Sequence, residues 1–106
     1  MKVSNTETIV GETITESLGI VRGNTIRARN VGRDIMAFAK NIVGGEVHEY
    51  TKLMAEAREQ AYDRMLEDAK SKGADGIVNV RFTTSTITQG AAELLAYGTA
   101  VKLAKK

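Results

Sequence analysis

The sequence contains no cysteine, proline or tryptophan, and aromatic residues make up only 5% of its 106 residues. Without cysteine the chain can form neither disulfides nor thiolate metal sites, and it has no thiolate nucleophile. Without proline, no strand carries one of the residues that commonly protect a sheet edge. The scarcity of aromatic side chains removes most of the stacking surface on which proteins bind single-stranded nucleic acid.

The chain also lacks an excess of charge of either sign. Fifteen basic residues are offset by 13 acidic residues, which leaves a formal net charge of +2 at pH 7. Basic and acidic residues are interleaved, and only the tail from Lys102 to Lys106 is locally basic. Nucleic-acid-binding proteins normally concentrate basic residues on one face, so we expect no nucleic-acid partner.

Long apolar runs are missing as well. No segment approaches the roughly 18 apolar residues of a membrane-spanning helix, and the N-terminal residues MKVSNTETIV lack the apolar core of a signal peptide. We therefore expect a cytoplasmic protein without a membrane partner. The length and the ordinary globular composition predict one domain that spans residues 1–106.

The N-terminal quarter is rich in Thr, Ile and Val and is interrupted by glycines, a pattern typical of strands. Gly23 and Asn24 could form the two-residue turn of a hairpin. A single long strand from about Thr13 to Ala28, interrupted by glycine, fits the pattern equally well. The residue pattern alone leaves both alternatives open.

Two helices are predicted in the middle of the chain. Asn30 is a favourable N-cap for a short apolar helix, and Gly44-Gly45 provide its end. A longer helix should begin at Glu46 or Val47 and run to Lys72. Its apolar positions at helical spacing predict a buried stripe of Tyr50, Met54, Ala57, Ala61 and Met65, with Leu53 on the flank. The opposite side should be exposed and carries Lys52, Glu56, Glu59, Asp63, Glu67 and Lys70.

A terminal hairpin is predicted from the strands Ile77–Thr88 and Ala92–Leu103, separated by Gln89 and Gly90. Their faces should alternate, with Val78, Val80 and Phe82 on the first strand and Leu95, Tyr97, Thr99 and Val101 on the second. The predicted fold is α+β, with an antiparallel sheet packed by one short and one long helix in the order β-α-α-β-β. Long strands without proline leave sheet edges and one sheet face uncovered, so we expect self-association.

A metal site is the first candidate chemistry, because the only imidazole, His48, lies between Glu46 and Glu49 at the start of the long helix. The three side chains do not share a helical face, and structural zinc usually takes about four Cys or His ligands. The simpler interpretation is that the glutamates complement the helix dipole and His48 is solvated. In a ring, copies from several subunits could instead complete a site at an axis or interface. The sequence assigns no metal ligand and no cofactor.

An anion site is the second candidate, because Arg29, Asn30 and Arg33 cluster where a strand gives way to a helix N-terminus. Free backbone N–H groups and two guanidiniums would suit a small anion, and we predict these three residues as ligand-binding. Alternatively, Asn30 caps the helix and Arg33 pairs with a carboxylate of a neighbouring subunit. No nucleophile-and-base arrangement is recognisable, so we expect no catalytic residue and no enzyme.

Two stretches carry a resemblance to a known family. RNVGRDIMAFAKNIVGGEVHEY, from Arg29 to Tyr50, and GADGIVNVRF, from Gly73 to Phe82, resemble the YbjQ-like family. The resemblance implies a small protein of a family labelled heavy-metal-binding, with a fold like that of dodecin subunits and a pentameric or decameric homo-oligomer. It also favours the single long strand over the hairpin at Gly23.

The residues and the resemblance together predict a non-enzymatic homo-oligomer that binds a small ligand, either an anion or a metal ion, between its subunits. The alternative is a structural or protein-interaction module without a ligand of its own.

Overall fold

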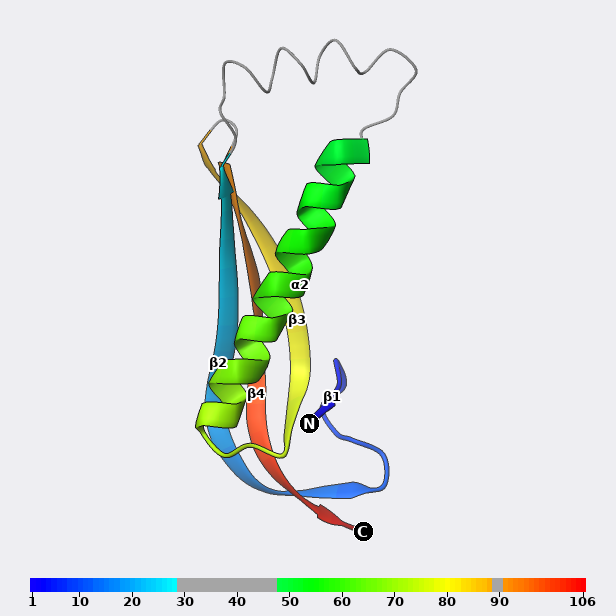
Figure 1. The fold of residues 1–106 in the computed structure, drawn as a ribbon. Coiled ribbons are helices and arrows are strands. Elements are labelled where there is room, and N and C mark those ends of the chain that lie inside the picture. The colour runs from blue at the N-terminus through cyan, green and yellow to red at the C-terminus, as the bar shows by residue number, and fades with distance from the viewer. Residues whose placement is uncertain (29–47, 89–90) are drawn as a thin grey trace.

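The computed structural model describes residues 1–28, 48–88 and 91–106. The elements along the chain are β1 (Lys2–Val3), β2 (Glu12–Ala28), α2 (His48–Ser71), β3 (Gly76–Thr88) and β4 (Ala91–Lys105). The strands form one sheet, and α2 lies along one of its faces (Figure 1). The α+β class is therefore confirmed. The short helix predicted to begin at Asn30 lies outside the described residues.

The sheet is mixed, with the strand order β1-β3-β4-β2. β4 pairs antiparallel with β2 and β3, whereas β1 pairs parallel with β3 through Lys2 opposite Gly76 and Val3 opposite Ile77. The prediction of a wholly antiparallel sheet was wrong. So was the predicted element order, because β1 precedes the long strand. A strand of two residues is too short to leave an alternating pattern in the sequence.

β2 is one long strand, as the resemblance favoured, and no hairpin forms at Gly23 and Asn24. Its register with β4 is continuous from Ile20 opposite Thr99 to Ala28 opposite Ala91. Two register shifts, between Ile14 and Glu16 and between Ser17 and Gly19, interrupt the ladder nearer the start of the strand.

At Gly23 the backbone of α2 approaches β2 very closely. A Cβ atom at Gly23 would clash with the backbone oxygen of Ala61 and the backbone nitrogen of Met65. The small side chains Ala57, Ala61 and Ala69 are fully buried, as is Met65. Only glycine on the strand and alanine on the helix permit this backbone separation.

The long helix is confirmed from His48 to Ser71, one residue short of its predicted end at Lys72, and its predicted start at Glu46 or Val47 lies outside the described residues. It stops before Gly73, whose φ of 74° is the left-handed conformation of a helix C-cap. The predicted stripe is confirmed at Ala57, Ala61 and Met65, and Ala69 extends it by one turn. Leu53 and Met54 are half-buried, and the side chain of Tyr50 lies outside the described residues. The predicted exposed side is also confirmed, at Lys52, Glu56, Glu59, Asp63, Glu67 and Lys70.

The core lies between α2 and the adjacent sheet face. The strand residues of this cluster come from all three long strands: Val21, Ile77, Val80, Ala96 and Ala100. They pack against Ala61, Met65 and Ala69 of α2. Burying such side chains stabilises the fold by roughly 25 cal/mol for each Å² of apolar surface removed from water.

The terminal hairpin of β3 and β4 is confirmed, but its predicted alternation of faces is wrong at one point. Asn79 has a φ of 55°, and Asn79 and Val80 together face Gly98, because Val78 pairs with Thr99 and Arg81 with Tyr97. One extra residue in a strand shifts the following side chains to the opposite face. Val80 therefore joins the core under α2, whereas Val78 lies on the other face of the sheet.

Within the described residues, no helix combines the length and the apolar character needed to cross a membrane.

Candidate functional site

β2 is an outer strand of the sheet, and side chains of α2 reach its free edge. Arg64, Asp68 and Lys72 are spaced four residues apart, so they project from one flank of the helix, next to the buried stripe. Each of them contacts a backbone group of β2. We call these three residues the edge cap.

The contacts of the edge cap follow β2 in steps of two residues. Lys72 Nζ donates to the Ile20 carbonyl oxygen at 3.3 Å, and the Arg22 backbone nitrogen donates to Asp68 Oδ2 at 3.1 Å. Arg64 Nη1 donates to the Asn24 carbonyl oxygen at 2.6 Å. Alternate residues of an outer strand direct their N–H and C=O groups away from the neighbouring strand, so the cap satisfies the groups that the sheet leaves free.

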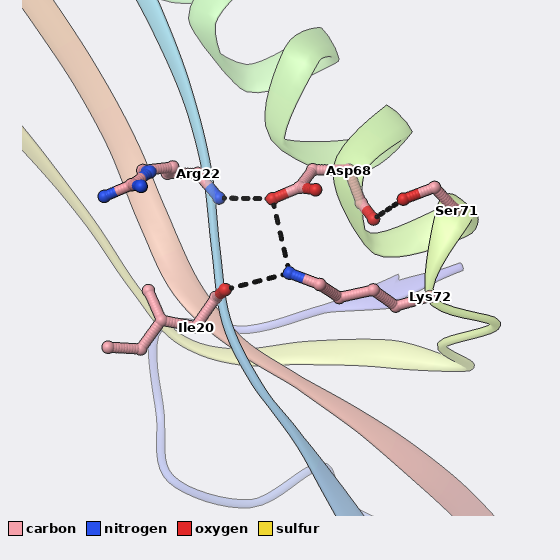
Figure 2. A network of polar contacts seen from close by, with 5 residues as sticks. All are labelled: Ile20, Arg22, Asp68, Ser71 and Lys72. Atoms are coloured by element: carbon pink, nitrogen blue, oxygen red, sulfur yellow. Dashed lines mark hydrogen bonds and ion pairs between the residues drawn. The ribbon is translucent and has the colours of Figure 1, made fainter.

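The cap is held together by interactions within α2. Lys72 Nζ lies 3.8 Å from Asp68 Oδ2, and Ser71 Oγ donates to the Asp68 carbonyl oxygen at 2.6 Å. Figure 2 shows the Asp68 carboxylate between the Arg22 nitrogen and the Lys72 ammonium. The two charged side chains are 35–40% exposed, so their ion pair contributes at most about 1 kcal/mol. Their hydrogen bonds to β2 matter more, because bonds to charged groups are worth about 1.5–3 kcal/mol when buried and less here.

A hollow of about 590 Å³ lies at this edge and is lined by Ile20, Arg22, Asn24, Asp68 and Lys72. Its Asp68 and Lys72 side chains are already used in capping β2. The Ile20 and Arg22 side chains point away from α2, toward the other face of the sheet (Figure 2). Within this hollow, Lys72, Asp68 and the edge of β2 therefore satisfy one another.

The sheet face opposite α2 is the second feature of interest. Ile20 is 68% exposed, Ile26 57% and Tyr97 37%. Polar side chains lie among them, and Asn24 Nδ2 donates to Glu93 Oε2 at 3.3 Å. We call this surface, formed by Ile20, Arg22, Asn24, Ile26, Glu93 and Tyr97, the open face. Exposed apolar side chains that share one sheet face and are bordered by polar ones are typical of an interaction surface.

Carboxylates gather on the outer side of α2. A hollow of about 440 Å³ is lined by Glu56, Glu59 and Asp63 together with Ala55 and Gln60. Nevertheless, across residues 1–28, 48–88 and 91–106 no three His, Asp or Glu side chains come close enough to form a metal site. The described part of the chain thus places carboxylates along α2 but does not bring three potential metal ligands together.

The residues predicted for ligand binding, Arg29, Asn30 and Arg33, lie outside the described residues. The same holds for Glu46 and for the side chains of His48 and Glu49. The prediction of an anion site there is neither confirmed nor contradicted.

The edge cap was not predicted from the sequence. Its signal was the i, i+4, i+8 spacing of Arg64, Asp68 and Lys72 beside the apolar stripe, a spacing that a solvated helix surface also shows. Only the position of β2 beside α2 distinguishes the two cases.

Comparisons with known proteins agree with the resemblance. A protein-family model described as "Putative heavy-metal-binding" matches residues 1–104. A UPF0145 protein of Halorubrum lacusprofundi is 61% identical over 103 residues, which cover 97% of this chain and 99% of the relative. A UPF0145 protein of Methanosarcina acetivorans is 55% identical over 103 residues, with 97% of both chains covered.

A crystal structure of a protein of unknown function from Pediococcus pentosaceus has the same fold, with a TM-score of 0.69 at 15% sequence identity and 98% of both chains covered. The match over residues 1–104 and the close relatives show that the chain belongs to the YbjQ-like family of UPF0145 proteins.

Proposed function

We propose that the protein is a non-enzymatic homo-oligomer, a pentamer or a pair of pentamers, that binds a small anion or a metal ion in pockets between its subunits. The open face carries this proposal. An isolated subunit leaves Ile20, Ile26 and Tyr97 exposed on one side of a sheet whose other side is packed by α2. Copies of the chain that cover this face would bury them.

The shape of the subunit supports the same conclusion. Its Cα radius of gyration is 17.6 Å, and its principal extents are 56 × 24 × 16 Å. A compact domain of this length has a radius of gyration of about 13 Å. A chain so elongated buries less of its own surface than a compact domain does, and association would supply the missing burial.

The ligand part of the proposal rests on chemistry that the sequence places together. Arg29, Asn30 and Arg33 supply two guanidiniums and an amide at a predicted helix N-terminus, which suits a small anion. A metal ion would instead need carboxylates or His48 from several subunits, consistent with the description of the family.

The edge cap favours a second candidate function, a structural or protein-interaction module without a ligand. Asp68, Arg64 and Lys72 are charged side chains beside a hollow, yet each is engaged with the backbone of β2. At this hollow, the charged side chains bind the backbone of β2 and are not free to bind a ligand.

Native mass spectrometry on untagged protein purified without chelator tests the proposal. We expect a mass of five or ten subunits with reproducible added mass, and we expect Arg33→Ala to lose an anionic adduct while the subunit number is unchanged. The exposed Lys52→Ala is the matched control for loss of a positive charge and should retain the adduct.

Addition of zinc or another divalent metal to the same sample distinguishes a metal ion from an anion. A bare oligomer under all of these conditions would favour the interaction module, and a monomer would contradict the proposed assembly.

A further inference from the structure

Among the described residues, the outer edge of β3 is covered over its first part only. Ser4 N donates to the Ile77 carbonyl oxygen at 2.9 Å, and Val80 N donates to the Ser4 carbonyl oxygen at 3.1 Å. Arg81 Nη1 donates to the Asn5 carbonyl oxygen at 2.8 Å. This is the last of the described contacts along the edge, and a hollow of about 380 Å³ lies beside it. β1 and the residues that follow it thus protect β3 as far as Val80.

From Phe82 to Thr88 the situation is different. All eight residues from Arg81 to Thr88 are exposed, with Phe82 at 48% and Ile87 at 54%. Among the described strands, only β4 pairs with this part of β3. Because Val80 N points outward to Ser4 and the backbone direction alternates, the N–H and C=O groups of Phe82, Thr84 and Thr86 also point outward. We call Phe82–Thr88 the bare edge.

The bare edge lacks charge and proline, two features by which proteins often protect an edge strand, and its only register shift lies at its end, between Thr86 and Thr88. Its sequence, FTTSTIT, contains no charged residue and no proline. By contrast, β2 has the edge cap and the start of β3 has β1. A neutral, β-branched strand with free N–H and C=O groups is the kind of edge to which another strand adds.

We infer that the bare edge pairs with the bare edge of a second copy, antiparallel and about a twofold axis. This inference rests on the proposed oligomer and specifies the contact between its two pentamers, because a ring of five subunits has no twofold axis of its own. Self-pairing brings no like charges together, and it places Thr and Ser residues opposite each other, a favourable cross-strand combination. The outer edge of β2 cannot pair with the bare edge of another copy along Ile20, Arg22 and Asn24, because the edge cap occupies the backbone groups there.

The pairing has a geometric consequence. Backbone groups that point outward can hydrogen-bond only with backbone groups of the partner that also point outward. Two residues that lie opposite each other must therefore both have even numbers or both have odd numbers. One residue therefore lies on the twofold axis and faces its own copy. The regular part of the bare edge, before the register shift between Thr86 and Thr88, places this residue among Thr83, Thr84 and Ser85.

Single-cysteine variants test the contact, because the chain has no cysteine of its own. We would make Thr83→Cys, Thr84→Cys and Ser85→Cys, and oxidise each mildly. A disulfide needs Cα atoms about 4.4–6.8 Å apart, a condition that directly opposed antiparallel residues meet. We expect a covalent dimer as the main product at one of the three positions and only traces with Glu67→Cys, which is exposed on α2.

Native mass spectrometry of the same samples distinguishes the failures. A five-subunit mass would overturn the β3 contact while the proposed assembly stands. So would ten-subunit oligomers that form no disulfide at any of the three positions, or no more than Glu67→Cys gives. Monomers would overturn both.

Thr84→Pro provides a second test, because it removes an outward N–H and an outer strand tolerates proline. Both copies lose a hydrogen bond, and we expect the twofold contact to weaken about 30-fold, equivalent to about 2 kcal/mol. An unchanged dissociation constant would contradict the inference.

Discussion

The two outer edges of the sheet are protected to different extents. Along β2, backbone groups at Ile20, Arg22 and Asn24 bind side chains of α2. Along the second half of β3, no strand among the described residues covers the bare edge, and every side chain from Arg81 to Thr88 is exposed. The difference follows from the position of α2, which packs against β2 and β4 and projects its charged flank over the β2 edge.

The two edges of this small sheet have different roles. The capped edge stabilises the subunit, because the residues that hold it lie next to the core. The bare edge contributes little to the subunit and is available for association. Substitutions on the two edges should therefore have different effects on folding.

The largest effect is expected from Gly23→Ala, which disrupts the packing of α2 against β2 and therefore also the edge cap. The added Cβ would clash with the backbone of Ala61 and Met65, so the helix must move away from β2. We expect the free energy of unfolding to fall by about 3 kcal/mol or more, measured by urea denaturation. Thr13→Ala, at an exposed position of the same strand, is the control and should stay within about 0.5 kcal/mol of wild type. Equal midpoints for the two variants would contradict the close approach.

A smaller effect is expected from Asp68→Ala, which leaves the Arg22 N–H without its acceptor and Lys72 without its ion pair. Since the site is partly open to water, we expect a loss of about 1 kcal/mol. Hydrogen exchange should report it locally, as faster exchange of the Arg22 amide. Glu67→Ala removes a neighbouring exposed carboxylate and should leave that amide unchanged.

Asp68→Asn sharpens the same test, because it keeps an acceptor oxygen and removes the charge. If the amide of Arg22 stays protected in Asp68→Asn, the hydrogen bond dominates over the ion pair. Unchanged exchange in Asp68→Ala would show that the carboxylate does not cap β2.

The smallest effect on folding is expected at the bare edge. Ile87 is 54% exposed, so Ile87→Thr should change the free energy of unfolding of the subunit by no more than about 0.5 kcal/mol. The measurement must be made at protein concentrations below those at which copies associate, since association adds to apparent stability. A loss comparable to that of Gly23→Ala would mean that the bare edge is part of the subunit core.

Much of the fold could be predicted from local pattern. The helical spacing of Ala57, Ala61 and Met65 identified the buried side of α2, because residues four apart lie on the same side of a helix. The β-branched residues identified the terminal hairpin, whereas the choice of one long strand at Gly23 came from the family resemblance. The turn of the hairpin was predicted at Gln89 and Gly90 because glycine marks turns.

The bulge at Asn79 could not be predicted in this way. An inserted residue changes which face the next side chains occupy, and Val78, Val80 and Phe82 look like one alternating run in the sequence. The candidate site was equally hard to identify, because Arg64, Asp68 and Lys72 have the spacing of an ordinary charged helix surface.

The sequence by itself determined the long helix, its buried side, the terminal hairpin and the membership in the family, since these depend on residues that are close along the chain or on similarity to relatives. The tertiary structure alone decided that Lys2 and Val3 pair parallel with β3, more than 70 positions away, and that one edge of the sheet is capped while another is bare. Contacts between distant segments depend on how the layers pack, and local sequence patterns do not record that packing.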